Sequence, residues 1–96
     1  MSRDEVLRRL AEHRKEIEAM GVKSVAIFGS TARDESREDS DVDILVEFSE
    51  PVGMFRFLDV KSELEKILGR EVDLATPDAL RKQMRPAILK EAIRAI

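Results

Sequence analysis

The spacing of apolar positions predicts a chain that alternates between helices and strands. Apolar residues recur every three or four positions over residues 2–20 and again over 54–68, which predicts two amphipathic helices, each followed by a glycine. Three short segments rich in branched and apolar residues predict strands at 22–28, 41–48 and 72–75. The order therefore favours a mixed sheet of about three strands flanked by helices, in the α/β class.

Capping residues and prolines predict three further helical segments. Ser30 is placed to cap a short helix over residues 31–34. Thr76 is expected to cap another helix, with Pro77 at its first position. Pro86 is expected to open a last helix that runs through Ile96.

Composition limits the chemistry that the protein can use. The 96 residues suit a single domain spanning 1–96, and 43% hydrophobic residues suffice for a small core. The absence of cysteine excludes disulfides, thiolate catalysis and cysteine-based zinc sites. The presence of only one histidine disfavours metal clusters built from histidines and Ser-His-Asp triads. No stretch resembles a signal peptide or a membrane span, so we expect a cytoplasmic protein without membrane contact.

Charge is unevenly distributed along the chain. The net charge of −3 gives no general attraction to nucleic acid. Residues 34–50 hold eight acids, Glu38 among them, against one arginine, a local net charge of −7. This run indicates either a cation site, a basic partner or a solvated loop. Residues 80–96 hold five basic residues against one acid, which suggests a solvated face or, less simply, a contact with a partner protein or RNA.

Asp41 and Asp43 form the first candidate site. Residues two apart on a strand point to the same face, while Val42 and Ile44 point to the core. The two carboxylates can therefore converge on hard cations about 3.5–4 Å apart, the spacing of two-metal phosphoryl-transfer sites. Burying two like charges without a cation would be costly. The pair should bind metal or lie open to water.

Gly29 and Ser30 form a candidate phosphate cradle. They follow a predicted buried strand, and a glycine lets a phosphate approach the backbone N–H groups while the serine hydroxyl adds a donor. Arg33 could reach the same anion. Two simpler interpretations remain: Ser30 only caps a helix, and Arg33 only pairs with Asp34 or Glu35 at the surface.

Asp73 supplies a third carboxylate. It lies between Val72 and Leu74 as Asp43 lies between Val42 and Ile44. If the two strands are neighbours, the acids share one face, and the third can complete a metal shell or accept a proton from an attacking hydroxyl. The alternative is a solvent-exposed acid at the edge of a strand.

Three motifs together resemble the minimal nucleotidyltransferases of the DNA polymerase β superfamily. They are Phe-Gly-Ser-Thr-Ala-Arg at 28–33, Ser-Asp-Val-Asp-Ile-Leu-Val at 40–46 and Val-Asp-Leu at 72–74, and the resemblance spans nearly the whole chain. It implies a minimal nucleotidyltransferase core in which Gly29 and Ser30 hold the triphosphate of ATP. It also implies that Asp41 and Asp43 ligate magnesium, two ions in all, and that Asp73 is the third catalytic acid.

The resemblance also implies a partner. Members of this family are often antitoxins encoded with a HEPN-family ribonuclease toxin, and they transfer AMP from ATP to a toxin tyrosine. We therefore expect a hetero-oligomer with a HEPN-family toxin and no nucleic-acid partner. Two alternatives stay open: an antitoxin that acts by binding only, and a nucleotidyltransferase for a small molecule such as an aminoglycoside, which the short chain disfavours.

Overall fold

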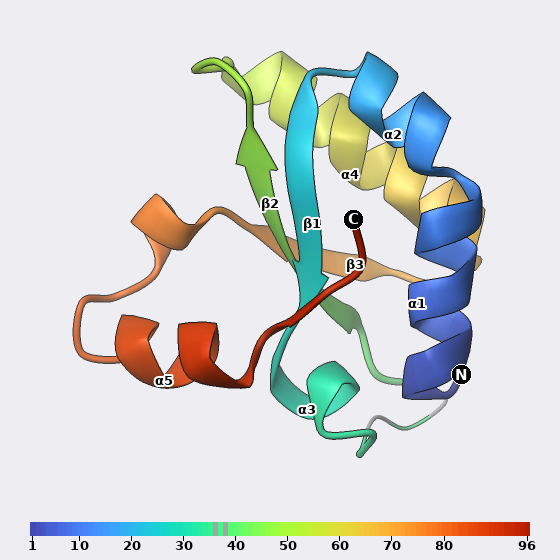
Figure 1. Ribbon diagram of the computed structural model, residues 1–96, viewed down its shortest axis with the longest axis vertical. Coiled ribbons are helices and arrows are strands. Elements are labelled where there is room, and N and C mark those ends of the chain that lie inside the picture. The colour runs from blue at the N-terminus through green and yellow to red at the C-terminus, as the bar shows by residue number, and fades with distance from the viewer. Residues whose placement is uncertain (36, 38) are drawn as a thin grey trace.

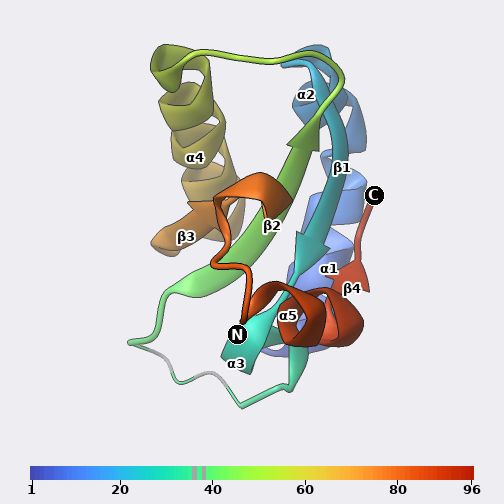
Figure 2. The same cartoon turned by 90° about the vertical axis from the view of Figure 1, so that its left-hand side faces the viewer.

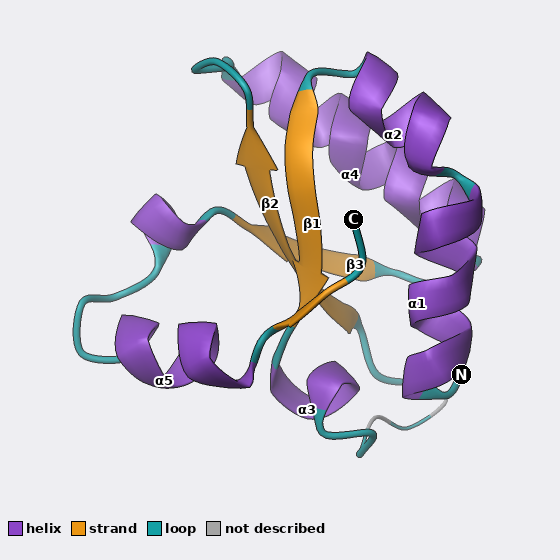
Figure 3. Ribbon diagram, viewed as in Figure 1, coloured by secondary structure: helices purple, strands orange, loops and turns teal. Residues whose placement is uncertain are grey.

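The computed structural model describes residues 1–35, 37 and 39–96, so Glu38 of the acidic run lies outside the described residues. Figures 1 and 3 show helices and strands alternating along the chain. Their order is α1 (Arg3–Glu12), α2 (Arg14–Ala19), β1 (Val22–Ile27), α3 (Gly29–Ala32), β2 (Val42–Phe48), α4 (Met54–Leu68), β3 (Val72–Ala75), the 3₁₀ turn η1 (Pro77–Ala79), α5 (Arg85–Glu91) and β4 (Ile93–Arg94).

The four strands form one mixed sheet in the order β3-β2-β1-β4. Strand β1 pairs antiparallel with both β2 and β4, whereas β2 and β3 run parallel. A parallel pair needs a long crossover, and α4 supplies it between β2 and β3. The predicted α/β class and mixed sheet are therefore confirmed, with one strand more than expected.

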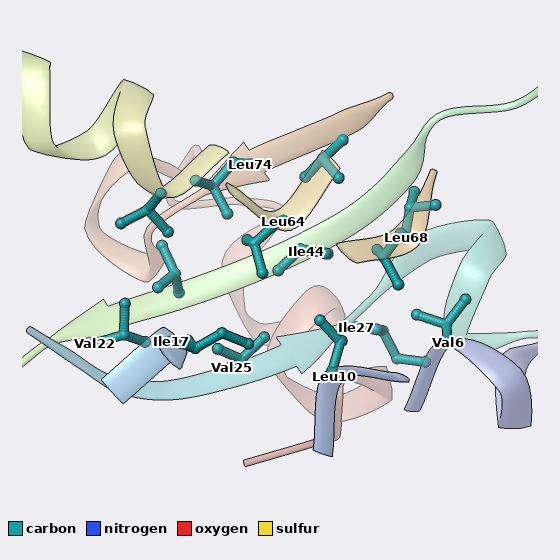
Figure 4. Close-up of a cluster of buried hydrophobic side chains, with 14 of the residues drawn as sticks. Val6, Leu10, Ile17, Val22, Val25, Ile27, Ile44, Leu64, Leu68 and Leu74 are labelled. Atoms are coloured by element: carbon teal, nitrogen blue, oxygen red, sulfur yellow. The ribbon is translucent and has the colours of Figure 1, made fainter. Parts of the chain in front are cut away.

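The core lies between the sheet and the helices α1, α2 and α4. Figure 4 shows Leu10 and Ile17 from the first two helices and Leu64 from α4 meeting Val25 and Ile44 of the sheet. Val42, Ile44 and Val46 of β2 belong to the core cluster, so the residues between them face away from α4, although one of these, Leu45, is also buried. The polar positions of β2 and β3 consequently share the side of the sheet opposite the core.

The predicted first helix is interrupted at His13. The prediction of one helix over residues 2–20 was wrong in this respect, because α1 ends at Glu12 and α2 begins at Arg14. The His13 Nδ1 lies 2.9 Å from the carbonyl oxygen of Arg9, and the His13 N–H instead donates to Leu10 at 3.2 Å. In a regular helix the His13 N–H would donate to the Arg9 carbonyl. Here the imidazole ring occupies that carbonyl instead, which interrupts the helix at His13.

The C-terminal segment differs most from its prediction. We expected a helix from Pro86 through Ile96, but α5 ends at Glu91 and Ala92 is extended, with φ −61° and ψ 138°. Ile93 then pairs with Ile27 and forms the fourth strand. A short apolar run allows helix or strand equally, and here the open edge of β1 decides, because pairing satisfies its backbone groups.

The remaining helix predictions have mixed outcomes. Helix α4 and its end at Gly69, which adopts a left-handed conformation with φ 67°, are confirmed. Pro77 does occupy the first position of a helical segment, but that segment is one 3₁₀ turn and Thr76 makes no capping hydrogen bond through its side chain. Within the described residues, none of the helices combines the length and apolar character needed to span a membrane.

Candidate active site

Asp43 and Asp73 are direct partners in the parallel pair of β2 and β3. Both strands turn their apolar residues toward α4, so the two carboxylates lie on the other side of the sheet. The start of β3 is held in register by two hydrogen bonds, from the Val42 N–H to Glu71 at 2.9 Å and from the Val72 N–H to Glu65 Oε2 at 3.0 Å. The predicted face shared by these two acids is confirmed.

Asp43 is the electrostatic centre of this group. Its own burial raises the pKa of its carboxyl most, and the nearby negative charge of Asp73 raises that pKa further. Asp41 adds a smaller contribution in the same direction, while the hydrogen bond from Ser30 lowers the pKa of Asp43. Asp41 itself is exposed and immediately precedes β2. The charge of Asp43 therefore interacts with those of both other acids.

Helix α3 is fastened to β2 through the backbone of Asp43. The Asp43 carbonyl accepts from the Phe28 N–H at 3.0 Å, and the Asp43 N–H donates to the buried Thr31 hydroxyl at 3.1 Å. Thr31 was not singled out by the sequence reasoning. Its position, inside the motif and two residues after the glycine, is the only sequence signal that could have indicated this role.

Ser30 points to the same aspartate. Its hydroxyl donates to Asp43 Oδ2 at 3.5 Å. The interpretation of Ser30 as a helix cap was wrong, because α3 begins at Gly29 and Phe28 occupies the capping position. The serine therefore lies within the first turn, where its side chain is free to reach β2 across the junction of strand and helix.

Gly29 is required by its neighbour on β2. It adopts φ +60°, and a Cβ atom built on it would lie 2.6 Å from Asp43 Oδ2. Real Cβ atoms do not approach an oxygen so closely, and a left-handed backbone is costly for other residues. The glycine thus allows Asp43 to sit against the turn.

Arg33 is bound by two carboxylates. Its Nε donates to Glu35 at 3.1 Å, and its NH1 donates to Glu91 Oε1 and Oε2 at 3.2 and 3.0 Å. The hydrogen bond to Glu35, followed by that to Glu91, raises the pKa of the guanidinium group. The surface ion pair with Glu35 is confirmed, whereas Asp34 instead accepts from the Arg3 N–H at 2.9 Å.

Glu91 was missed by the sequence reasoning. Besides contacting Arg33, its Oε1 accepts from the Gly29 N–H at 3.0 Å. Figures 1 and 2 both place α5 beside α3, at the end of the sheet where β1 ends and β2 begins. Glu91 is 62 residues from Gly29 in the chain, so no local pattern could have indicated this contact.

The three acids have the ligand chemistry that a divalent metal prefers, but their side chains do not yet converge on one point. Hard cations such as Mg²⁺ prefer carboxylate oxygens, and a cation would relieve the repulsion by Asp73 that, after burial, raises the pKa of Asp43. Across residues 1–35, 37 and 39–96, however, no three His, Asp or Glu side chains lie close enough to hold an ion. Asp41, Asp43 and Asp73 are thus neighbours whose side chains would have to converge on the metal.

A groove lies elsewhere on the molecule. Its volume is about 600 Å³, and it is lined by residues at the far end of β2, the start of α4 and η1, among them Phe48, Met54, Phe57 and Pro77. Asp43 is near the opposite end of β2 and does not line it. Asp41 and Asp73 are exposed and Asp43 is half-buried, so the acids lie on an open face.

Comparisons with known proteins agree with the fold. The sequence profile described as "Nucleotidyltransferase domain" matches residues 7–96. The protein adenylyltransferase MntA of Thermococcus cleftensis is 40% identical over 85 residues, which are 88% of this chain and 86% of that protein. A solved structure described as a candidate minimal nucleotidyltransferase superposes with a TM-score of 0.83 at 35% identity, covering 97% of this chain and 95% of the other.

A more distant structure shares the fold. It holds a tri-AMPylated HEPN toxin of Shewanella oneidensis in complex with an MNT antitoxin, and the matched chain superposes with a TM-score of 0.66 at 13% identity. The match covers 94% of this chain and 71% of the other. At that identity the likeness concerns the fold alone.

Proposed function

Because this chain belongs to the nucleotidyltransferase domain family, we propose that it transfers AMP from ATP to a hydroxyl of a HEPN-family toxin and acts as its antitoxin. The observation that carries the proposal is the pairing of Asp43 with Asp73 beside Gly29 and Ser30. A relative named a protein adenylyltransferase and a fold shared with an antitoxin bound to an AMPylated HEPN toxin support the acceptor class.

The transfer exchanges one phosphorus–oxygen bond for another. The acceptor hydroxyl oxygen bonds to the α-phosphorus of ATP, the bond from that phosphorus to the bridging oxygen of the β-phosphate breaks, and pyrophosphate leaves. The hydroxyl proton passes to the exposed carboxylate of Asp73. Ser30, Arg33 and the Gly29 N–H bind the phosphates, because each donates hydrogen bonds to anionic oxygens. Fixed donors of this kind align the α-phosphorus with the acceptor.

Asp41, Asp43 and Asp73 would hold magnesium, two ions in the proposed mechanism. Bound there, the metal neutralises phosphate charge during the transfer. Asp43 is positioned for this role by the backbone bonds that tie it to Phe28 and Thr31. Its Oδ2 also accepts from Ser30, which favours the ionised form that a metal requires.

The acceptor must come from another protein if it is a tyrosine. The chain contains no tyrosine, so it cannot modify itself on that residue. The acids lie on an open face, and the groove of about 600 Å³ is not lined by them. The partner is therefore expected to supply much of the acceptor site.

The test is the mass of the partner after incubation with ATP and Mg²⁺. A HEPN-family toxin encoded beside this protein should gain whole AMP units with the wild type and none with Asp73→Asn. Asp59→Asn, an exposed carboxylate on α4, is the matched control and should behave as wild type. Full toxin inhibition by Asp73→Asn without ATP would instead establish an antitoxin that acts by binding only.

A further inference from the structure

The carboxylate of Glu91 occupies donors that the proposed function assigns to ATP. Its Oε1 accepts from the Gly29 N–H at 3.0 Å and from Arg33 NH1 at 3.2 Å, while its Oε2 accepts from Arg33 NH1 at 3.0 Å. One acidic side chain from the end of α5 thus engages both the backbone and the charged donor beside Ser30.

A carboxylate and a phosphate offer these donors the same chemistry. Both present negatively charged oxygens, which form short, charge-assisted hydrogen bonds with N–H and guanidinium groups. The single proton of the Gly29 N–H cannot serve two anions at full strength. Glu91 would also repel a triphosphate brought to the same place, because both are negatively charged and both compete for the single positive charge of Arg33.

We propose that Glu91 is an internal competitor of the triphosphate, which sets the affinity for ATP. This inference rests on the proposed function. In the free protein Glu91 satisfies Gly29 and Arg33, and ATP binds by displacing it. Part of the free energy of ATP binding is then spent on breaking the Glu91 contacts. The protein therefore binds ATP more weakly than it would with Gly29 and Arg33 already free.

The surroundings of Glu91 allow this displacement. Helix α5 has no buried residue. The side chain of Leu89 in the helix is 45% exposed, and that of Met84 just before it is 50% exposed. The helix continues into β4, whose two residues hold the edge of β1. The Glu91 side chain can therefore turn away, or α5 can tilt, without opening the core under α1, α2 and α4.

A different role for Glu91 predicts the opposite sign. If Glu91 positioned Arg33 for the phosphate, its removal would weaken ATP binding. If it competes, its removal tightens ATP binding, because Gly29 and Arg33 are then free before the ligand arrives.

The test compares Glu91→Gln with Glu35→Gln. Each variant replaces one of the two carboxylates that bind Arg33 with a neutral amide. Of these two glutamates, only Glu91 also contacts the Gly29 N–H. Titration calorimetry with Mg²⁺ and either ATP or inorganic triphosphate should show tighter binding by roughly 3- to 10-fold for Glu91→Gln, with less than about a 2-fold change for Glu35→Gln. The KM for ATP should fall in parallel in the transfer assay.

The outcomes separate the two proposals. Wild type that binds ATP while Glu91→Gln binds it equally or more weakly overturns the competitor role and leaves the transferase standing. No ATP binding by either protein overturns the proposed function, and the competitor role with it. Glu91→Asp, which retains the charge but shortens the side chain, should also tighten binding and serves if Glu91→Gln melts well below wild type.

Discussion

The carboxylate of Asp43 fills the space in which a side chain at Gly29 would begin. A Cβ atom at Gly29 would lie 2.6 Å from Asp43 Oδ2 and 3.2 Å from its carboxyl carbon. The glycine of the motif therefore has a role independent of any nucleotide. It keeps the turn from pushing the central aspartate out of place.

Gly29→Ala should consequently lower the transfer rate far more than Gly69→Ala does, although the two substitutions lower stability by similar amounts. Gly69→Ala is the matched control, since Gly69 has a similar φ of +67° but a Cβ atom added to it would meet no atom within 4 Å. Each substitution should cost about 1–2 kcal/mol from the left-handed backbone. Only Gly29→Ala should also lower kcat/KM, by about 100-fold or more, because it displaces Asp43. Equal transfer rates in the two variants would contradict this role.

Thr31→Val should loosen the junction between α3 and β2. The substitution preserves shape but leaves the Asp43 N–H without its acceptor, which should lower the free energy of unfolding by about 1–3 kcal/mol. Thr31→Ser retains the hydroxyl and should keep the bond, losing only a methyl contact. Urea unfolding of the two variants measures the difference, and a Thr31→Val protein as stable as Thr31→Ser would show the bond to be dispensable.

Asp43→Asn should stabilise the protein near neutral pH while abolishing transfer. Burial and the charge of Asp73 raise the pKa of Asp43 in the folded state above its ordinary value of 3.8. Between the ordinary pKa of 3.8 in the unfolded chain and the higher pKa in the folded protein, the folded state binds more protons than the unfolded chain. Stability therefore falls as the pH rises from the lower pKa through the higher one. Above it the ionised group is a net cost, which asparagine removes.

Thermal unfolding without divalent metal checks this sign. Asp43→Asn should melt above wild type at pH 7, and the difference should vanish toward pH 3. Asp59→Asn should match wild type throughout. Added Mg²⁺ should raise the melting temperature of wild type more than that of Asp43→Asn. A lower melting temperature for Asp43→Asn at pH 7 would show that its contacts outweigh the repulsion.

Ser30→Ala should act on both ATP use and its pH dependence. Loss of the hydroxyl removes a phosphate donor and should lower kcat/KM for ATP by roughly 10- to 100-fold. It also removes the hydrogen bond that lowers the pKa of Asp43, so the acid side of the pH–rate profile should shift to higher pH. Ser62→Ala on α4 is the control. An unshifted profile would mean that Ser30 does not influence Asp43 during turnover.

The strand positions of the site could be predicted because they depend on local alternation. Asp43 and Asp73 each lie between two apolar residues, and that pattern already placed both on the side of their strand away from the core. Whether the two strands are neighbours stayed open in the sequence, and the structure pairs them in parallel with α4 as the crossover between them. Their adjacency, direction and register therefore needed the structure.

The contacts of α3 and α5 could not be predicted in the same way. Thr31 bonds to a backbone group twelve residues away, and Glu91 reaches Gly29 across 62 residues. Such contacts depend on how separate elements pack, which no periodicity encodes. The end of α5 was misjudged for the same reason, because the free edge of β1 and not the sequence of residues 92–96 makes that segment extended.

Glu65 on α4 affects the candidate site although it contacts none of the three acids. Its carboxylate fixes the Val72 N–H at the start of β3, and β3 has only four residues with which to hold its alignment. A slip of one residue would turn Asp73 to the core side and bring an apolar side chain beside Asp43. A substitution of Glu65, on a helix remote from the acids, would therefore silence the protein and lower its melting temperature together, because the same slip buries Asp73 in the core.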